Sequence, residues 1–164
     1  MKTFVAAFLI ITLALAGCES KKETLSETEL EKEREAVALV LEKYVIANER
    51  QEIDLVKDIW APDEDIVVFG TDSDEKIVGW ESIRNTLEEQ FRSFNQTYIS
   101  VRDQNIRINE YGCTAWFSEI VNYNYIHNGE AMSYEGLRFT GVLEKRNGDW
   151  YIVQSHMSIP GNSR

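Results

Sequence analysis

Hydrophobic residues recur at helical spacing in three parts of the first half of the chain. Ser26 and Glu29 have the spacing of a capping box, so the first helix is expected to begin there. One face of this helix is formed by Leu30, Val37, Leu41, Tyr44, Val45 and Asn48. The pattern predicts a second, shorter helix over Glu52–Trp60, which stops before Pro62, and a third over Trp80–Phe94.

The rest of the pattern is typical of β-strands. Asp65–Gly70 is β-branched and aromatic, and is expected to pair with Lys76–Val78 in a short hairpin. From Thr97 onward apolar positions alternate, and a change of phase predicts a β-bulge near residues 103–105. Two Asn-Gly pairs, at residues 128–129 and 147–148, then separate three further strands that are predicted over residues 113–126, 132–144 and 150–158. This order indicates an α+β fold with four long antiparallel strands.

The start of the chain has a different character. Phe4–Ala16 is a continuous apolar run behind Lys2; it has the length of a signal peptide and is shorter than the roughly 20 residues of a membrane-spanning helix. The run ends in Leu15-Ala16-Gly17-Cys18, which resembles a bacterial lipobox, although an ordinary secretory signal is the alternative. The expected organisation is a signal peptide over residues 1–17, a lipidated Cys18 and tether over 18–25, and one domain over 26–164.

The charge of the chain limits its partners. The sequence has a formal net charge of −11, and removal of Lys2 with the signal peptide would make it −12. Nucleic acid is an unsuitable partner, because its binding depends on Lys and Arg contacts to phosphate. The membrane is expected to be contacted through acyl chains on Cys18 alone, at the extracytoplasmic face of the bacterial cell envelope. No cofactor is expected, and no metal site either, because the chain has only two histidines.

Two charged residues occupy facing positions in apolar strands, where an unpaired charge is costly. If residues 128–129 form a two-residue type I′ turn, Glu119 lies opposite Arg138 on one face of the sheet. An opposed acid and guanidinium stabilise each other across strands, and a bidentate contact would keep both charged. We therefore expect Glu119 and Arg138 to form a polar cluster; an ion pair that only fixes the sheet is the alternative.

The position of His156 depends on the second turn. A two-residue turn at residues 147–148 puts His156 opposite Phe139, on the other face of the sheet. A three-residue loop over residues 146–148 puts it opposite Arg138 and adds it to the cluster. A core histidine that is hydrogen-bonded to the backbone is a further alternative.

Short motifs along the chain resemble those of a known family. They are, in order, Gly70-Thr71-Asp72, Gly79-Trp80, Arg138-x-Thr140, Asn147-Gly148-Asp149-Trp150 and His156-x-Ser158. They make the stretch from Glu33 to Pro160 similar to a SnoaL-like domain, in the superfamily that includes nuclear transport factor 2, ketosteroid isomerase and the calcium/calmodulin-dependent kinase association domain. The resemblance implies a cone in which a curved antiparallel sheet cups about three helices around a pocket, with frequent dimerisation through the outer sheet surface. It also favours the three-residue loop.

This fold hosts enzymes, binding proteins and assembly domains, so function has to be argued from the site. The favoured expectation is a pocket that binds a small organic ligand, anionic compounds included, without converting it. Polar contacts are expected from Arg138 and His156. Apolar walls are expected from five aromatic residues, each of which on its own is also typical of a core: Tyr44, Trp60, Phe69, Trp80 and Tyr123.

Two alternatives remain open. One is an isomerase, hydratase or cyclase with Glu119 as general base, a role that the resemblance implies for an acid in the cavity. Arg138 beside Glu119 would lower the pKa of this carboxyl and weaken it as a base. The other alternative is an assembly module that forms a homodimer and has a vestigial pocket.

Overall fold

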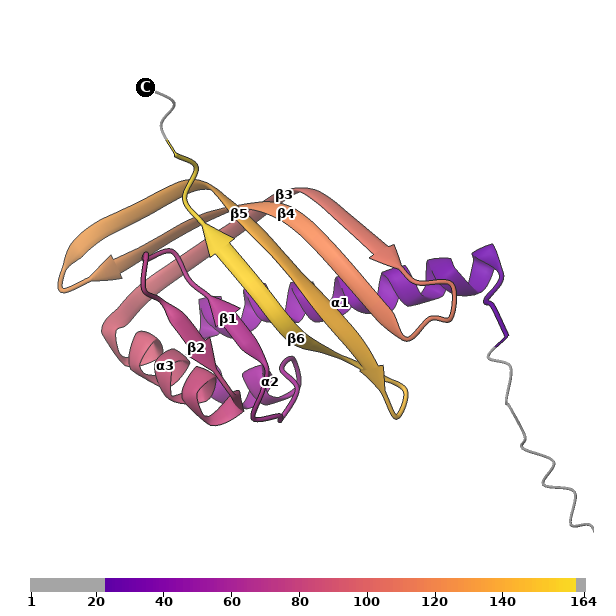
Figure 1. The fold of residues 1–164 in the computed structure, drawn as a ribbon. Coiled ribbons are helices and arrows are strands. Elements are labelled where there is room, and N and C mark those ends of the chain that lie inside the picture. The colour runs from indigo at the N-terminus through magenta and orange to yellow at the C-terminus, as the bar shows by residue number, and fades with distance from the viewer. Residues whose placement is uncertain (1–22, 162–164) are drawn as a thin grey trace, which may run out of the picture.

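The computed structural model of the protein describes residues 23–161 (Figure 1). Its helices and strands are, in chain order, α1 (Glu27–Arg50), α2 (Ile53–Lys57), β1 (Val67–Phe69), β2 (Lys76–Val78), α3 (Trp80–Ser93), β3 (Phe94–Ile108), β4 (Thr114–His127), β5 (Glu130–Arg146) and β6 (Asp149–Ser158). The expected signal peptide and the lipidation site Cys18 lie outside the described residues. Within residues 23–161, no helix combines the length and the hydropathy needed to cross a bilayer.

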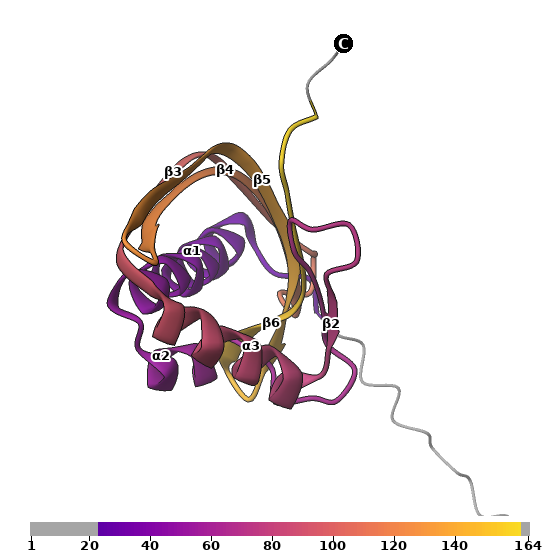
Figure 2. The same cartoon turned by 90° about the vertical axis from the view of Figure 1, so that its left-hand side faces the viewer.

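One six-stranded sheet organises the domain, in the order β2-β1-β6-β5-β4-β3. Neighbouring strands are antiparallel except β1 and β6, which pair in parallel. Figure 2 shows the sheet curving around α1, with α2 and α3 across the open side of the curve. The predicted α+β fold, a curved sheet that cups three helices, is therefore confirmed. The short β1–β2 hairpin lengthens the sheet beyond β6.

Local sequence explains where the first two helices begin and end. The predicted capping box is present, since the backbone N–H of Ser26 donates to Glu29 Oε2 at 2.8 Å and the Ser26 hydroxyl accepts from the backbone N–H of Glu29. The second helix is shorter than predicted. Its chain leaves helical geometry because residues 59–61 hydrogen-bond to the backbone of Ile152 in β6, which fixes them in an extended conformation.

The first Asn-Gly pair forms the predicted two-residue turn. Asn128 and Gly129 have φ values of 51° and 84°, and the residues on either side of them pair directly. Farther along, Gly136 adopts a φ of 69° at a bulge that shifts the β4–β5 register by one residue. The predicted bulge in β3 is also present, as a register shift between Arg102 and Asn105.

The bulge at Gly136 overturns the predicted ion pair. Glu119 lies opposite Phe139, and Arg138 lies opposite Ile120. The expected contact between Glu119 and Arg138 was wrong, because the register was extended from the turn without a bulge. A shift of one residue moves a side chain to the other face of the sheet, so Glu119 points inward and Arg138 is exposed outside.

The second Asn-Gly pair is also a two-residue turn, so the favoured three-residue loop was wrong. An extra residue at Val153 then shifts the β5–β6 register, and His156 lies opposite Thr140. Neither predicted partner of His156, Phe139 or Arg138, faces it. His156 is exposed on the outer face of the sheet, as is Arg138.

The hydrophobic core fills the space between the sheet and α1. Its fully buried members come from every layer and include Val37, Leu41, Val56, Ile59, Val121, Phe139, Leu143 and Ile152.

The polar side of α1 is attached to the last hairpin through Glu33, whose carboxylate accepts hydrogen bonds from Lys145 Nζ at 2.6 Å and from Trp150 Nε1 at 2.8 Å. The core stops short of the region under the β1–β2 hairpin, where a cavity remains.

Candidate functional site

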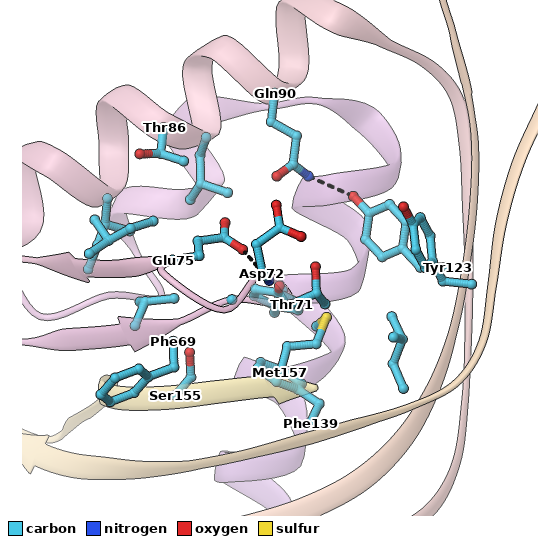
Figure 3. A pocket seen from close by; sticks show the side chains of 18 of the residues that line it. Phe69, Thr71, Asp72, Glu75, Thr86, Gln90, Tyr123, Phe139, Ser155 and Met157 are labelled. Atoms are coloured by element: carbon cyan, nitrogen blue, oxygen red, sulfur yellow. Dashed lines mark hydrogen bonds between the residues drawn. The ribbon is translucent and has the colours of Figure 1, made fainter. Parts of the chain in front are cut away.

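A cavity of about 310 Å3 lies between the concave face of the sheet, α1, α3 and the β1–β2 hairpin (Figure 3). Its walls are largely aromatic, with contributions from Tyr44, Trp60, Phe69, Phe94, Tyr123, Tyr125, Tyr134 and Phe139. Several of these rings pack on one another, and the centroids of Tyr44 and Phe139 are 4.9 Å apart. A mostly apolar wall with a few polar groups is the usual composition of a small-molecule site.

A chain of hydrogen bonds crosses the cavity wall from α3 to α1. Gln90 Nε2 donates to the Tyr123 hydroxyl at 2.9 Å, as Figure 3 shows, and that hydroxyl donates to Asn48 Oδ1 at 3.3 Å. Asn48 Nδ2 in turn donates to the backbone oxygen of Tyr44 at 2.8 Å. Each side chain fixes the next, so the cavity presents a preorganised polar edge within its aromatic surface.

The two inner tyrosines remain neutral phenols at physiological pH. Burial is the main cause that raises the pKa of Tyr123, and the hydrogen bond from Gln90 offsets it only in part. Burial also raises the pKa of Tyr44, and the negative charges of Glu119 and Glu75 raise it further. These hydroxyls can therefore form hydrogen bonds to a ligand but are poorly suited to act as bases.

The acidic turn between β1 and β2 brings two carboxylates to the cavity. Asp72 and Glu75 both belong to its lining, and Figure 3 shows their carboxylates directed toward α3. The turn is held by the Asp72 backbone N–H, which donates to Glu75 Oε2 at 3.3 Å, and by the Glu75 N–H, which donates to the Asp72 carbonyl at 3.2 Å. Gly70 lies directly against the Glu75 carboxylate, where a Cβ would collide with it.

Four of the predicted aromatic residues lie at the cavity: Tyr44, Trp60, Phe69 and Tyr123. Phe69 is at its edge and 41% exposed, and its ring is edge-on to that of His156, with centroids 6.0 Å apart. Trp80 begins α3 and packs against the core outside the lining. Arg138 and His156 lie on the outer face of the sheet, so neither reaches the cavity from the position in which it is found.

Glu119 points inward but does not line the cavity. It is only 3% exposed and accepts a hydrogen bond from Gln104 Nε2 at 2.7 Å. Burial raises the pKa of its carboxyl, and the hydrogen bond from Gln104 opposes part of that change. Glu119 of β4 is thus a buried acid that is hydrogen-bonded to Gln104 of β3.

Sequence reasoning missed most of the polar lining. The predicted hairpin has Asp72 and Glu75 between its two strands, and the sequence assigned them no site role. Gln90 could have been found, because it is three residues after Leu87 and four before Phe94, on the apolar stripe of the third helix. Among residues 23–161, no three His, Cys, Asp or Glu side chains are grouped so that they could hold a metal ion.

Comparison with solved structures shows the same architecture in several bacterial proteins. A nuclear transport factor 2-like superfamily protein from Salmonella enterica serovar Typhimurium superposes with a TM-score of 0.73 at 17% identity, covering 82% of this chain and 95% of that chain. A Caulobacter vibrioides protein with a cystatin-like fold gives 0.68 at 15%, covering 80% and 92%. A Streptomyces avermitilis protein, provisionally named a dehydratase of the NTF2-like family, gives 0.68 at 15%, covering 80% and 99%.

At these identities the structural likeness establishes the fold alone. No curated protein is similar to the chain in sequence. The profile of the SnoaL-like domain family matches residues 37–162, which include nearly all of the described helices and strands. The chain therefore belongs to the SnoaL-like domain family.

Proposed function

We propose that this protein binds a small organic ligand in the cavity beneath the β1–β2 hairpin and releases it unchanged. The observation that carries the proposal is an aromatic cavity of about 310 Å3 whose polar edge is fixed by the Gln90–Tyr123–Asn48 chain of hydrogen bonds. Preorganised polar groups orient a ligand at little entropic cost, and the aromatic walls supply apolar contact area.

Buried hydrogen-bonding groups at the cavity support the proposal. Trp60 is 3% exposed and belongs to the lining, and within the described residues its Nε1–H has no hydrogen-bond partner. Ser155 is 2% exposed and also belongs to the lining, and its hydroxyl makes no hydrogen bond to another described side chain. The Trp60 Nε1 atom is itself covered, so the Ser155 hydroxyl is the one of these two groups that a ligand could pair with.

The charge of the lining favours a neutral or cationic ligand. Asp72 and Glu75 both contribute to it, whereas none of its members is Lys, Arg or His. The sequence suggested Arg138 and His156 as partners for an anionic ligand, but both are exposed on the outer face. An anion would thus approach two carboxylates with no compensating cation, so we exclude anionic compounds from the proposal.

The position of Glu119 argues against the general-base role that the sequence suggested for this residue. A general base has to lie within hydrogen-bonding reach of the proton that it removes. Glu119 is outside the lining and is already paired with Gln104, while Tyr44 and Tyr123 have raised pKa values. Some structural neighbours are provisionally named dehydratases, but their identity to this chain is too low to carry an activity over.

The proposal places the domain on the extracytoplasmic face of the bacterial cell envelope, held by acyl chains on Cys18. The support for this location is the Leu15–Cys18 motif at the end of an apolar run. We also propose that the domain forms homodimers through the outer face of the sheet, where the aromatic side chains of Tyr98 and Trp116 are exposed.

A ligand screen with a blocked cavity tests the binding function. Thr86→Phe fills the cavity from α3, whereas Asn85→Phe adds the same ring to an exposed neighbouring position outside the lining. Neutral and cationic cyclic compounds are screened by thermal denaturation, where a ligand at 100 times its Kd adds about 2.7 kcal/mol of stability. We expect compounds that stabilise the native protein and Asn85→Phe but not Thr86→Phe. A screen in which every compound leaves the native melting temperature unchanged contradicts the proposal.

A further inference from the structure

We propose that the ligand is an organic cation, a small amine whose ammonium group lies against Asp72 and Glu75 while its apolar body occupies the aromatic cavity. This inference rests on the proposed binding function and narrows it to one chemical class. Three features of the described residues carry it: two carboxylates without a counterion, aromatic rings beside them, and unpaired polar groups deeper in the wall.

The two carboxylates have no cationic partner within residues 23–161. Neither Asp72 nor Glu75 takes part in any of the ion pairs there. The adjacent basic residue, Lys76, is exposed and is not in the lining, and its Nζ lies over the Phe69 ring, 5.9 Å from the centroid. Both carboxylates belong to the lining, so an ammonium group bound there would meet two negative charges.

The aromatic walls attract the same kind of ligand. Tyr44, Tyr123 and Phe139 all belong to the lining, and the negative charge of Glu75 is one of the causes that raise the pKa of the Tyr44 hydroxyl. The acidic turn and the aromatic wall thus line the same cavity. A cation close to both gains from the carboxylates and from the electron-rich ring faces.

The remaining polar groups indicate a second feature of the amine. The buried Trp60 Nε1–H lacks an acceptor within the described residues, and the Ser155 hydroxyl belongs to the lining without a hydrogen bond to another described side chain. Figure 3 shows Ser155 on β6, on the opposite side of the cavity from α3. The Trp60 Nε1 atom is covered by protein, so a ligand with a hydroxyl or carbonyl oxygen beyond its apolar body would pair with the Ser155 hydroxyl.

A matched series of probes tests the charge. Tyramine, tyrosol and 4-hydroxyphenylacetate share a hydroxyphenyl body and differ in an ammonium, a hydroxyl or a carboxylate head. Their dissociation constants are measured by calorimetry on the purified full chain at pH 7. We expect tyramine to bind about tenfold more tightly than tyrosol, equivalent to about 1.4 kcal/mol, and 4-hydroxyphenylacetate to bind most weakly. The preference for tyramine should shrink as the salt concentration rises.

Variants of the turn show whether these carboxylates cause the preference. The double substitution Asp72→Asn with Glu75→Gln should bring the dissociation constant of tyramine to within about twofold of that of tyrosol for the same variant. Asp74→Asn is the matched control, since Asp74 is in the same turn but outside the lining, and it should keep the preference. Single substitutions at Asp72 and Glu75 provide the same reading if the double variant unfolds.

The possible outcomes distinguish the failure of the organic-cation proposal from the failure of the proposed ligand binding. Equal binding of tyramine and tyrosol, or a preference that survives the double substitution, overturns the cation class and leaves the cavity as a binding site. Failure of all three probes, with neutral compounds from the thermal screen still binding, also overturns the cation class. If none of the three probes binds and no compound in the thermal screen raises the melting temperature, the proposed binding function is overturned.

Discussion

The Gln90 amide of α3 and the Tyr123 hydroxyl of β4 are joined by a hydrogen bond of 2.9 Å across the cavity wall. Because Tyr123 also donates to Asn48 of α1, one buried hydroxyl connects the sheet to two helices. This phenol is therefore expected to stabilise the fold as well as to orient the ligand. The connection is one that a change of a single atom can test.

Tyr123→Phe removes the hydroxyl and leaves the side chains of Gln90 and Asn48 without this partner. We expect the free energy of unfolding to fall by about 1–3 kcal/mol, the usual cost of leaving a buried polar group unsatisfied. Urea denaturation measures the change. Tyr98→Phe, at a side chain that is 63% exposed, is the control and should have almost no effect. Equal stability of the native protein and Tyr123→Phe would show that the hydrogen-bond chain contributes nothing.

The pH dependence of stability should report the buried acid Glu119. Burial raises its pKa in the folded protein above the ordinary value of 4.5, so the folded state binds this proton more tightly than the unfolded state. Stability therefore falls as the pH rises from the unfolded pKa through the raised folded pKa, and changes no further above it. Glu119→Gln removes this titration. The free energy of unfolding of the variant, relative to that of the native protein, should therefore increase with rising pH.

Denaturation curves across that pH range measure the Glu119 effect. Gln retains an oxygen that can accept from Gln104 Nε2, so the variant keeps the hydrogen bond while losing the titration. Glu130→Gln changes an exposed carboxyl beside the first turn and should leave the pH profile as it is. A parallel pH profile for the native protein and Glu119→Gln would mean that the pKa of Glu119 is the same in the folded and unfolded states.

The order of helices and strands could be predicted from sequence. Which side chains of the last two strands point to the inner face of the sheet could not. Periodicity, the capping box and the two Asn-Gly pairs are local signals, and they located the helices and both turns, although the second helix is shorter than predicted and the favoured loop at the second pair was wrong. A one-residue bulge reverses every side chain beyond it, and nothing in the sequence near Val153 marks one. At the other bulge, Gly136 itself is the only signal in the sequence that indicates a bulge. Arg138 and His156 were consequently assigned to the cavity and are found outside it.

The polar lining was missed for a different reason. Asp72 and Glu75 are in a short acidic turn, and composition alone cannot distinguish a turn in solvent from one that folds over a cavity. Both residues join the cavity lining only in the folded protein, where β1 pairs with β2 and β6. The aromatic walls were easier to predict, because buried aromatic residues are needed whether they contact a ligand or only the core.

Glu33 should be the main polar link between α1 and the last hairpin. Its carboxylate accepts from Lys145 Nζ at 2.6 Å and from Trp150 Nε1 at 2.8 Å. Glu33→Ala is expected to lower the free energy of unfolding by about 1–3 kcal/mol, because it leaves a buried indole N–H without an acceptor. Glu35→Ala, at an exposed position on the same helix, is the control for lost helix charge. Chemical denaturation that shows equal losses for both variants would contradict a specific role for Glu33.

Substitution of Cys18 tests the proposed envelope location. If acyl chains on this residue hold the domain, Cys18→Ser should shift the protein from the membrane fraction to the soluble extracytoplasmic fraction, since lipid chains rather than charge provide the attachment. Fractionation with immunodetection and incorporation of labelled palmitate measure the two effects. Cys113→Ser is the matched control and should remain in the membrane fraction with its label. An unlabelled native protein would instead favour an ordinary secretory signal.

The outer face of the sheet carries the last prediction, that of a homodimer. Trp116 is 48% exposed on β4 and Tyr98 is 63% exposed on β3, which gives this face large aromatic surfaces without a covering layer in the described part of the chain. Tryptophan is enriched among the residues that dominate interface energies, each contributing about 2 kcal/mol or more. Trp116→Asp should therefore weaken self-association at least tenfold in sedimentation experiments. Leu39→Asp, at an exposed position on α1, adds the same charge away from this face and should leave association unchanged. A native protein that sediments as a monomer at all concentrations, or equal effects of the two variants, would remove the outer face as a dimer interface.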